Sequence, residues 1–223
     1  MNQMKQMDYD VELNFYHNNK NFLNLIDNDI NLTNVIGISA GALNGANYLA
    51  GNRGRSAIAI LKNRFNPHYV GLKAYRESGS VVGFKYLFED LNEECQINED
   101  RLYKGDRNLY VGATNLSTGK TDYFKIDNHD IYVKACTASA SMPLVSKMIK
   151  IGNNKYLDGG CETKLPIRYA IDNAEPIKDT ELIVLNEYPL QPLEEALINK
   201  VSNNVTKKSI FDLFEVKENS IHI

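Results

Sequence analysis

One short stretch, GISAG at residues 37–41, constrains the fold more than any other part of the chain. The apolar residues before it, 35–38, have the character of a buried strand. After Ser39, residues recur at helical spacing, so one helix face would carry Ala40, Leu43, Ala46 and Leu49. The sequence therefore predicts a strand, a sharp turn at the serine and then a helix.

Strand and helix patterns alternate along most of the chain, which favours a sheet with packed helices. Two β-rich runs flank the turn-rich NLSTGK at 115–120 and predict a hairpin. A second helix is predicted within 54–65, and further strands are predicted at 8–15, within 144–151, before Asp158 and at 181–185. With 223 residues, of which 43% are hydrophobic, we predict one α/β domain spanning 1–223.

The composition narrows the functional classes. A net charge of −3 without a dense basic stripe argues against nucleic acid as a partner. No run approaches the roughly 20 apolar residues of a membrane span, and the first residues lack a signal-peptide core, so we expect a cytoplasmic protein. The three cysteines, Cys95, Cys136 and Cys161, are widely spaced and predict reduced thiols rather than a disulfide framework or a metal site.

The glycines around Ser39 fit a nucleophile on a strand-to-helix turn. A serine nucleophile needs an exposed oxygen on a rigid turn, and Gly37 and Gly41 would let the backbone pass close to the helix. The pattern alone arises by chance with a probability on the order of 0.1 in a chain of this kind. These residues by themselves therefore leave open whether Ser39 is a nucleophile or a small residue in a tight bend.

A serine nucleophile also needs a base, and the chain offers a carboxylate and four histidines. Asp158 precedes Gly159 and Gly160, so its carboxylate could approach another group without obstruction, although Asp-Gly-Gly also suits an ordinary turn. The histidine alternative is an α/β-hydrolase triad, in which only His222 follows the aspartate in the required order. We predict surface positions for the other three, His17, His68 and His129.

Four segments together resemble the patatin-like phospholipases in order and spacing. They are VIGISAGALNG, GATNLSTGKTDYF, ASASMPLV and KYLDGGCETKLPI, and the resemblance extends over about residues 20–185. It implies a three-layer αβα fold with a central mixed sheet and a Ser-Asp dyad that hydrolyses acyl esters of lipids. Residues 1–20 and 186–223 match the family poorly.

The resemblance assigns roles to individual residues. Ser39 would be the nucleophile and Asp158 the base, with Gly37, Ala40 and Gly41 in the nucleophile elbow and oxyanion region. Gly159 and Gly160 would form the base loop, and no metal or other cofactor is implied. The family's glycine-rich oxyanion loop is not recognisable, because the region before the nucleophile reads DVELNFYHNNK and the first glycine of the chain is Gly37.

These observations leave two functions besides a patatin-like phospholipase or lipase. One is a catalytically impaired lipid- or protein-binding member of the same fold, and the other is the α/β-hydrolase with its triad ending in His222. A phospholipid or another acyl-ester lipid is the expected substrate, with transient contact to a membrane surface. The candidates for a lipid-facing surface are 81–88 and 209–214, although core packing is the favoured interpretation of both.

Overall fold

The computed structural model of the chain describes residues 26–27, 31–163, 165–173, 181–182 and 206–207. Its contacts divide the chain into two units, residues 22–165 and residues 1–21 together with 166–223. The predicted strand at 8–15 lies outside the described residues. That the chain forms one domain stays a prediction.

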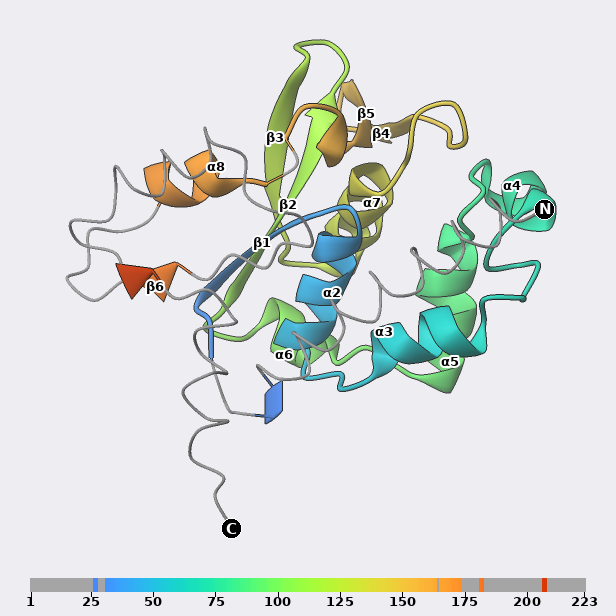
Figure 1. The fold of residues 1–223 in the computed structure, drawn as a ribbon, viewed down its shortest axis with the longest axis horizontal. Helices are drawn as coiled ribbons and strands as arrows, with labels where there is room; N and C mark the ends of the chain where they lie inside the picture. Colours follow the sequence, from blue (N-terminus) through green and yellow to red (C-terminus); the bar gives the residue numbers. More distant parts are fainter. Residues whose placement is uncertain (1–25, 28–30, 164, 174–180, 183–205, 208–223) are drawn as a thin grey trace. The chain divides into compact units, whose positions relative to one another are not determined.

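The unit 22–165 contains five strands and the helices that accompany them (Figure 1). The strands are β1 (Asn34–Ile38), β2 (Asn108–Asn115), β3 (Lys120–Lys125), β4 (Ile149–Ile151) and β5 (Asn154–Asp158). The α-helices are α2 (Ala40–Leu49), α3 (Arg55–Ala57), α4 (Leu72–Ser78), α5 (Leu91–Glu94), α6 (Glu99–Tyr103) and α7 (His129–Ser139). The described residues of this unit also include two π-helical segments, η1 (Ile58–Lys62) and η2 (Tyr86–Asp90), and one 3-10 turn, η3 (Gly159–Cys161).

The five strands form one mixed sheet around β2. Strand β1 pairs with β2 in parallel, whereas β3 and β5 pair with β2 in the antiparallel sense and β4 extends the sheet beyond β5. Strand β3 pairs with β2 along Tyr110–Asn115, which overlaps the registers of both β1 and β5. Because a strand has only two edges, β1 and β5 must share the other edge of β2.

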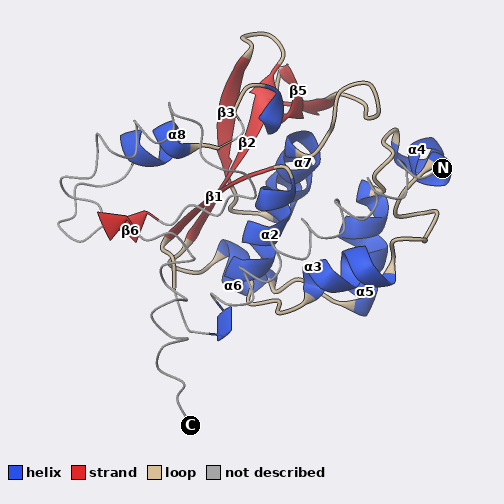
Figure 2. Cartoon of the chain, viewed as in Figure 1, coloured by secondary structure: helices blue, strands red, loops and turns tan. Residues whose placement is uncertain are grey.

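Helices α2 and α7 pack against the same face of β2 (Figure 2). Leu109 and Ala113 are four residues apart in β2 and therefore point to the same side. Leu109 lies under Gly45 of α2, and Ala113 packs with Ala138 of α7. Small residues at these contacts let both helices approach the sheet closely. The structure thus has a central mixed sheet flanked by helices, and the predicted fold class is confirmed.

The other unit has few described elements. They are α8 (Ile167–Asp172) and a parallel pairing of two short strands, β6 (Glu181–Leu182) with β7 (Thr206–Lys207). Strand β6 coincides with the start of the predicted strand 181–185, whose remainder lies outside the described residues.

Several predicted elements are confirmed and one needs correction. The strand-turn-helix at 34–49, the hairpin of β2 and β3, and the helical segment within 54–65 are all present. Within 144–151, only Ile149–Ile151 forms a strand, because residues 144–148 leave the sheet as an exposed loop. For the run 81–88 the favoured interpretation, core packing, is confirmed, because Phe84, Tyr86, Leu87 and Phe88 are all buried. The other lipid-facing candidate, 209–214, lies outside the described residues.

Candidate active site

The sheet itself brings Ser39 and Asp158 together. Strand β1 ends at Ile38, opposite Gly112 of β2, and β5 ends at Asp158, opposite Ala113. The two strands run toward each other along the same edge of β2, so their carboxyl ends meet at neighbouring register positions. Ser39 follows the last residue of β1, and Asp158 is the last residue of β5.

Ser39 occupies a strained backbone conformation between β1 and α2. Its φ of 54° and ψ of −124° lie outside the regions that residues with a Cβ atom favour. Gly37 makes the tight turn possible, because a Cβ atom there would lie 2.5 Å from the Cα atom of Ala42. The prediction of a sharp strand-to-helix turn at the serine is confirmed.

The side chains of the serine and the aspartate are directly hydrogen-bonded. The Ser39 hydroxyl donates to Oδ2 of Asp158 at 2.8 Å, across 119 residues of sequence. The other carboxylate oxygen, Oδ1, accepts the Gly160 N–H at 2.8 Å. Each oxygen of the carboxylate therefore has a donor, and Oδ2 is in position to accept the hydroxyl proton.

The environment of Asp158 favours its protonated form. The residue is only 8% exposed, and this burial raises the pKa of its carboxyl group above the ordinary value. Hydrogen bonds from the Gly160 N–H and the Ser39 hydroxyl lower the pKa, but their effect is smaller than that of burial. A raised pKa makes the carboxylate a better proton acceptor than an exposed aspartate.

Backbone contacts hold Asp158 and its loop against the sheet. The Asp158 N–H donates to the Ser141 carbonyl at 2.8 Å, and the Thr114 hydroxyl donates to the Asp158 carbonyl at 2.9 Å. Gly159 passes so close to β2 that a Cβ atom there would lie 2.5 Å from the Gly112 carbonyl oxygen. The two glycines after Asp158 therefore have different structural roles. Gly159 lets the loop approach β2 closely, and Gly160 directs its N–H at the carboxylate of Asp158.

A third serine, which the sequence did not single out, fixes the position of Ser39. Ser139 is fully buried at the end of α7, and its Oγ accepts the Ser39 N–H at 2.8 Å. The same hydroxyl donates to the Gly112 carbonyl at 2.6 Å. Ser139 thus ties the strained turn to the central strand. The only hint in the sequence is its place in the small-residue segment ASASMP.

The start of α2 offers backbone donors beside the Ser39 hydroxyl. Ala40 and Gly41 are the first residues of this helix, where N–H groups have no intrahelical acceptor. A Cβ atom at Gly41 would have no neighbour within 4 Å, so Gly41 faces open space and, unlike Gly37, is not required by close packing. Residues 10–20, which read DVELNFYHNNK where the family has its oxyanion loop, lie outside the described residues.

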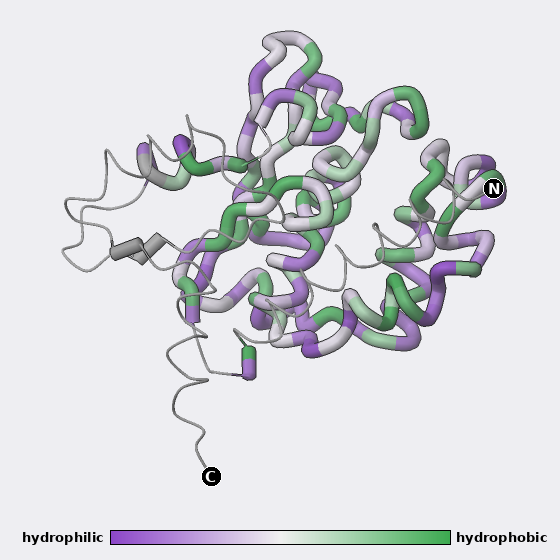
Figure 3. Tube along the Cα trace, viewed as in Figure 1, coloured by the Kyte–Doolittle hydropathy of each residue, from purple (hydrophilic) through white to green (hydrophobic). Residues whose placement is uncertain are grey.

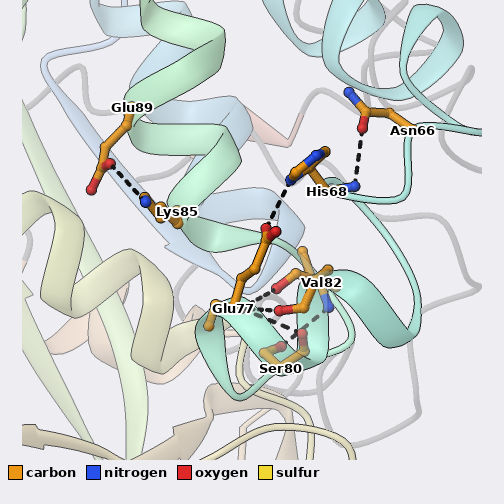
Figure 4. Close-up of polar contacts among 9 residues, drawn as sticks. Asn66, His68, Glu77, Ser80, Val82, Lys85 and Glu89 are labelled. Carbon is orange, nitrogen blue, oxygen red and sulfur yellow. Dashed lines mark hydrogen bonds and ion pairs between the residues drawn. The ribbon is translucent and has the colours of Figure 1, made fainter.

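The described histidines are bonded to glutamates and not to Ser39 or Asp158. His68 pairs through Nδ1 with Glu77 at 2.8 Å (Figure 4), and His129 pairs in the same way with Glu99 at 2.7 Å. Both side chains are substantially exposed, which confirms the predicted surface positions. His17 and His222 lie outside the described residues.

In the part of the chain that the structure describes, no group of three or more His, Cys, Asp or Glu side chains is arranged to hold a metal ion. No helix in that part is long and apolar enough to cross a membrane. The three cysteines are free: Cys136 is buried, Cys95 is partly buried and Cys161 is exposed.

Comparison with known protein families shows to which family the chain belongs. The model of the patatin-like phospholipases matches residues 21–171, which is most of the sequence and includes both Ser39 and Asp158. The chain belongs to the patatin-like phospholipase family. Membership supports a lipid acyl hydrolase at the level of the family. No curated protein matches the chain significantly.

Proposed function

We propose that this protein hydrolyses carboxylic esters of lipids with Ser39 as the nucleophile and Asp158 as the base. The observation that carries the proposal is the 2.8 Å hydrogen bond between the Ser39 hydroxyl and Oδ2 of Asp158. The serine lies on a strained turn and the aspartate is buried with a raised pKa. Structural strain and a shifted pKa in one place are typical of catalytic groups.

The reaction runs in two steps. In the first step, Oγ of Ser39 attacks the ester carbonyl carbon while its proton passes to Asp158, and the protonated carboxyl group then gives that proton to the departing alcohol. In the second step, Asp158 takes a proton from water, the resulting hydroxide attacks the acyl-enzyme, and the acid is released as Ser39 recovers its proton. No histidine is needed for either step.

Charge on the ester oxygen would be stabilised at the start of α2. The Ala40 N–H follows the nucleophile and has no acceptor within its helix, so it is the first candidate oxyanion donor. The positive end of the helix dipole lies at the same place and favours a developing negative charge. The open space beside Gly41 leaves room for a substrate at this end of the helix.

A second candidate is a binding protein of the same family with impaired catalysis. It is favoured by the sequence before Gly37, which contains no glycine to form the family's oxyanion loop. Loss of a single oxyanion donor typically costs about 10²–10³ in turnover, so loss of a whole loop would leave little activity. Lipid binding does not depend on those donors and would survive. A cytoplasmic location stays a prediction for either candidate.

Steady-state hydrolysis tests the proposal. The substrates are a short-chain p-nitrophenyl ester and phospholipid vesicles, each compared between the unaltered protein and Ser39→Ala. We expect turnover that disappears in Ser39→Ala and in Asp158→Asn, whose amide keeps the shape of the side chain but does not accept the proton. Equal rates in the unaltered protein and Ser39→Ala would refute the nucleophile. Full activity in His222→Ala would eliminate the triad alternative.

A further inference from the structure

The exposed hydrophobic side chains of the described residues are not spread evenly. Seven of the ten large ones lie in two short segments, 70–75 and 142–148. We call these seven residues the apolar rim: Val70, Leu72, Tyr75, Met142, Leu144, Val145 and Met148. Figure 3 shows the hydrophobic stretch in the loop between α7 and β4. Scattered exposed hydrophobic residues need no explanation, but a concentration of this kind marks an interaction surface.

Hydrogen bonds connect both segments of the rim to residues 79–81, which follow α4. The Gly71 N–H of the first segment donates to the Val81 carbonyl at 2.9 Å. The Val81 N–H donates to the Val145 carbonyl at 3.0 Å, and the Lys147 N–H donates to the Gly79 carbonyl at 2.7 Å. The hydroxyls of Ser80 and Ser146 are also bonded, at 2.7 Å. The loop 142–148 is therefore fastened to the α4 segment.

The second segment of the rim directly follows part of the candidate active site in the sequence. Its second segment begins at Met142, directly after the stretch that contains Ser139 and Ser141. Ser139 binds the Ser39 N–H, and the Ser141 carbonyl accepts the Asp158 N–H. Met142 of the rim is therefore three residues from Ser139 and one residue from Ser141.

The charged residues near the rim indicate which kind of apolar partner it would bind. Lys73 and Lys147 lie in the rim segments 70–75 and 142–148, which contain no aspartate or glutamate, and Arg76 follows the first segment, in a chain whose net charge is −3. The acidic residue that comes next, Glu77, pairs with His68. The stem of Lys147 packs over Gly79, where a Cβ atom would lie 2.8 Å from its Cδ. All three cations are exposed, and they lie within the rim segments or directly beside them. Exposed hydrophobic side chains among cations are complementary to a membrane surface rich in anionic lipids.

Leu144 at the centre of the loop supports the same conclusion. Its side chain is fully exposed, at 101% of the reference area, and its φ is 70°. A branched residue at positive φ is unfavourable, and here no burial of the side chain offsets the cost. The fold therefore presents a large apolar side chain to its surroundings in a strained conformation. Insertion into lipid would supply the burial that the folded chain does not.

We propose that the apolar rim docks on an anionic lipid surface. The inference rests on the proposed function, since it names the surface from which the lipid substrate would enter. The segment 81–88 is mostly buried in the core, so the apolar rim, and not this segment, is the lipid-facing surface that we propose for unit 22–165. The hydrophobic side chains insert below the headgroups, and the three cations lie among the anionic headgroups.

Vesicle sedimentation tests the docking surface separately from catalysis. All proteins carry Ser39→Ala so that lipid is not consumed, and the vesicles contain phosphatidylcholine alone or with phosphatidylserine. We expect tighter binding to the mixed vesicles and weaker binding as salt increases. Replacing Leu72 and Leu144 together by glutamine should weaken binding by about tenfold or more, because two inserted leucines are lost. Lys147→Glu should weaken it by about tenfold.

Matched controls lie outside the rim. Leu116→Gln changes another exposed leucine, and Lys125→Glu changes another exposed lysine, so neither should alter vesicle binding. Thermal unfolding of each variant verifies the fold. No binding to the mixed vesicles, or equal weakening by Leu116→Gln, would overturn the proposal. A dimer seen by sedimentation velocity that becomes monomeric in Leu144→Gln would also overturn the proposal, because a second copy of the chain would then cover the rim. Ser39-dependent ester hydrolysis would leave the proposed function standing in all these cases.

Discussion

The structure makes a sharp prediction for Ser139→Ala. The substitution removes one hydroxyl from a fully buried site and changes nothing on the surface. That hydroxyl accepts the Ser39 N–H at 2.8 Å and donates to the Gly112 carbonyl at 2.6 Å. Without it, the N–H of the strained turn loses its acceptor and the position of the nucleophile is no longer tied to β2.

The expected magnitude follows from these two contacts. A buried polar group left without a partner costs about 1–3 kcal/mol, so losing both bonds should lower the free energy of unfolding by roughly 2–4 kcal/mol. Because a displacement of about 1 Å at a reacting group reduces the rate by about a hundredfold, kcat for ester hydrolysis should fall by about tenfold to a hundredfold. Urea denaturation measures the first quantity, and steady-state kinetics under conditions where the variant is folded measure the second.

Ser141→Ala is the matched control for this prediction. Ser141 is also fully buried and lies only two residues away, but its hydroxyl donates to the Thr137 carbonyl rather than to the turn at Ser39. Its backbone carbonyl, which binds the Asp158 N–H, is unchanged by the substitution. Ser141→Ala should therefore cost only about 1 kcal/mol and leave kcat nearly unaltered. If Ser139→Ala and Ser141→Ala have the same kcat, Ser139 does not position the nucleophile.

Three other outcomes follow from the same contacts. Burial raises the native pKa of Asp158 above its unfolded value, so its carboxyl group stabilises the fold less as the pH rises. In a series of denaturation measurements, the stability of Asp158→Asn relative to the unaltered protein should therefore increase from about pH 4 toward neutrality. A difference in stability that stays constant with pH would contradict the raised pKa. Gly37→Ala should lower the thermal midpoint by several degrees, since its Cβ would overlap the Ala42 backbone, whereas Gly41→Ala in open space should not. Arg55 is buried and donates hydrogen bonds to four oxygen atoms, those of Cys95, Leu87, Asn47 and Asn92. Arg55→Met should therefore lower the free energy of unfolding, measured by urea denaturation, by about 3 kcal/mol or more. A decrease below about 1 kcal/mol would show that these oxygens find other donors.

Local patterns in the sequence predicted the parts of the site but not their assembly. Glycine spacing and an apolar run located the turn at Ser39, and the sequence before Asp158 predicted the strand that ends there. Residues that are close in the sequence and lie in the same turn produce a local sequence pattern of this kind. The register that places β1 and β5 end to end on β2 joins residues 119 positions apart, and only the resemblance to a family suggested that pairing.

Other features left too little signal to predict. Ser139 acts through a single buried hydroxyl, and a serine in a small-residue segment has the same sequence pattern whether or not that hydroxyl is used. The runs 81–88 and 144–148 are both apolar, yet the first is mostly core and the second is an exposed loop. Hydrophobicity alone does not distinguish these fates, because burial depends on which neighbouring elements cover each run.

Labelling with a fluorophosphonate probe tests the central claim most directly. Such a probe reacts with a serine hydroxyl only when a neighbouring base and the surrounding donors activate it, so it reports on the Ser39–Asp158 pair without requiring the natural lipid. We predict that mass spectrometry will find one phosphonylated residue, Ser39, and that Asp158→Asn will abolish labelling while leaving the protein folded. A folded protein in which Ser39 is not labelled, or in which labelling persists undiminished in Asp158→Asn, would contradict the account.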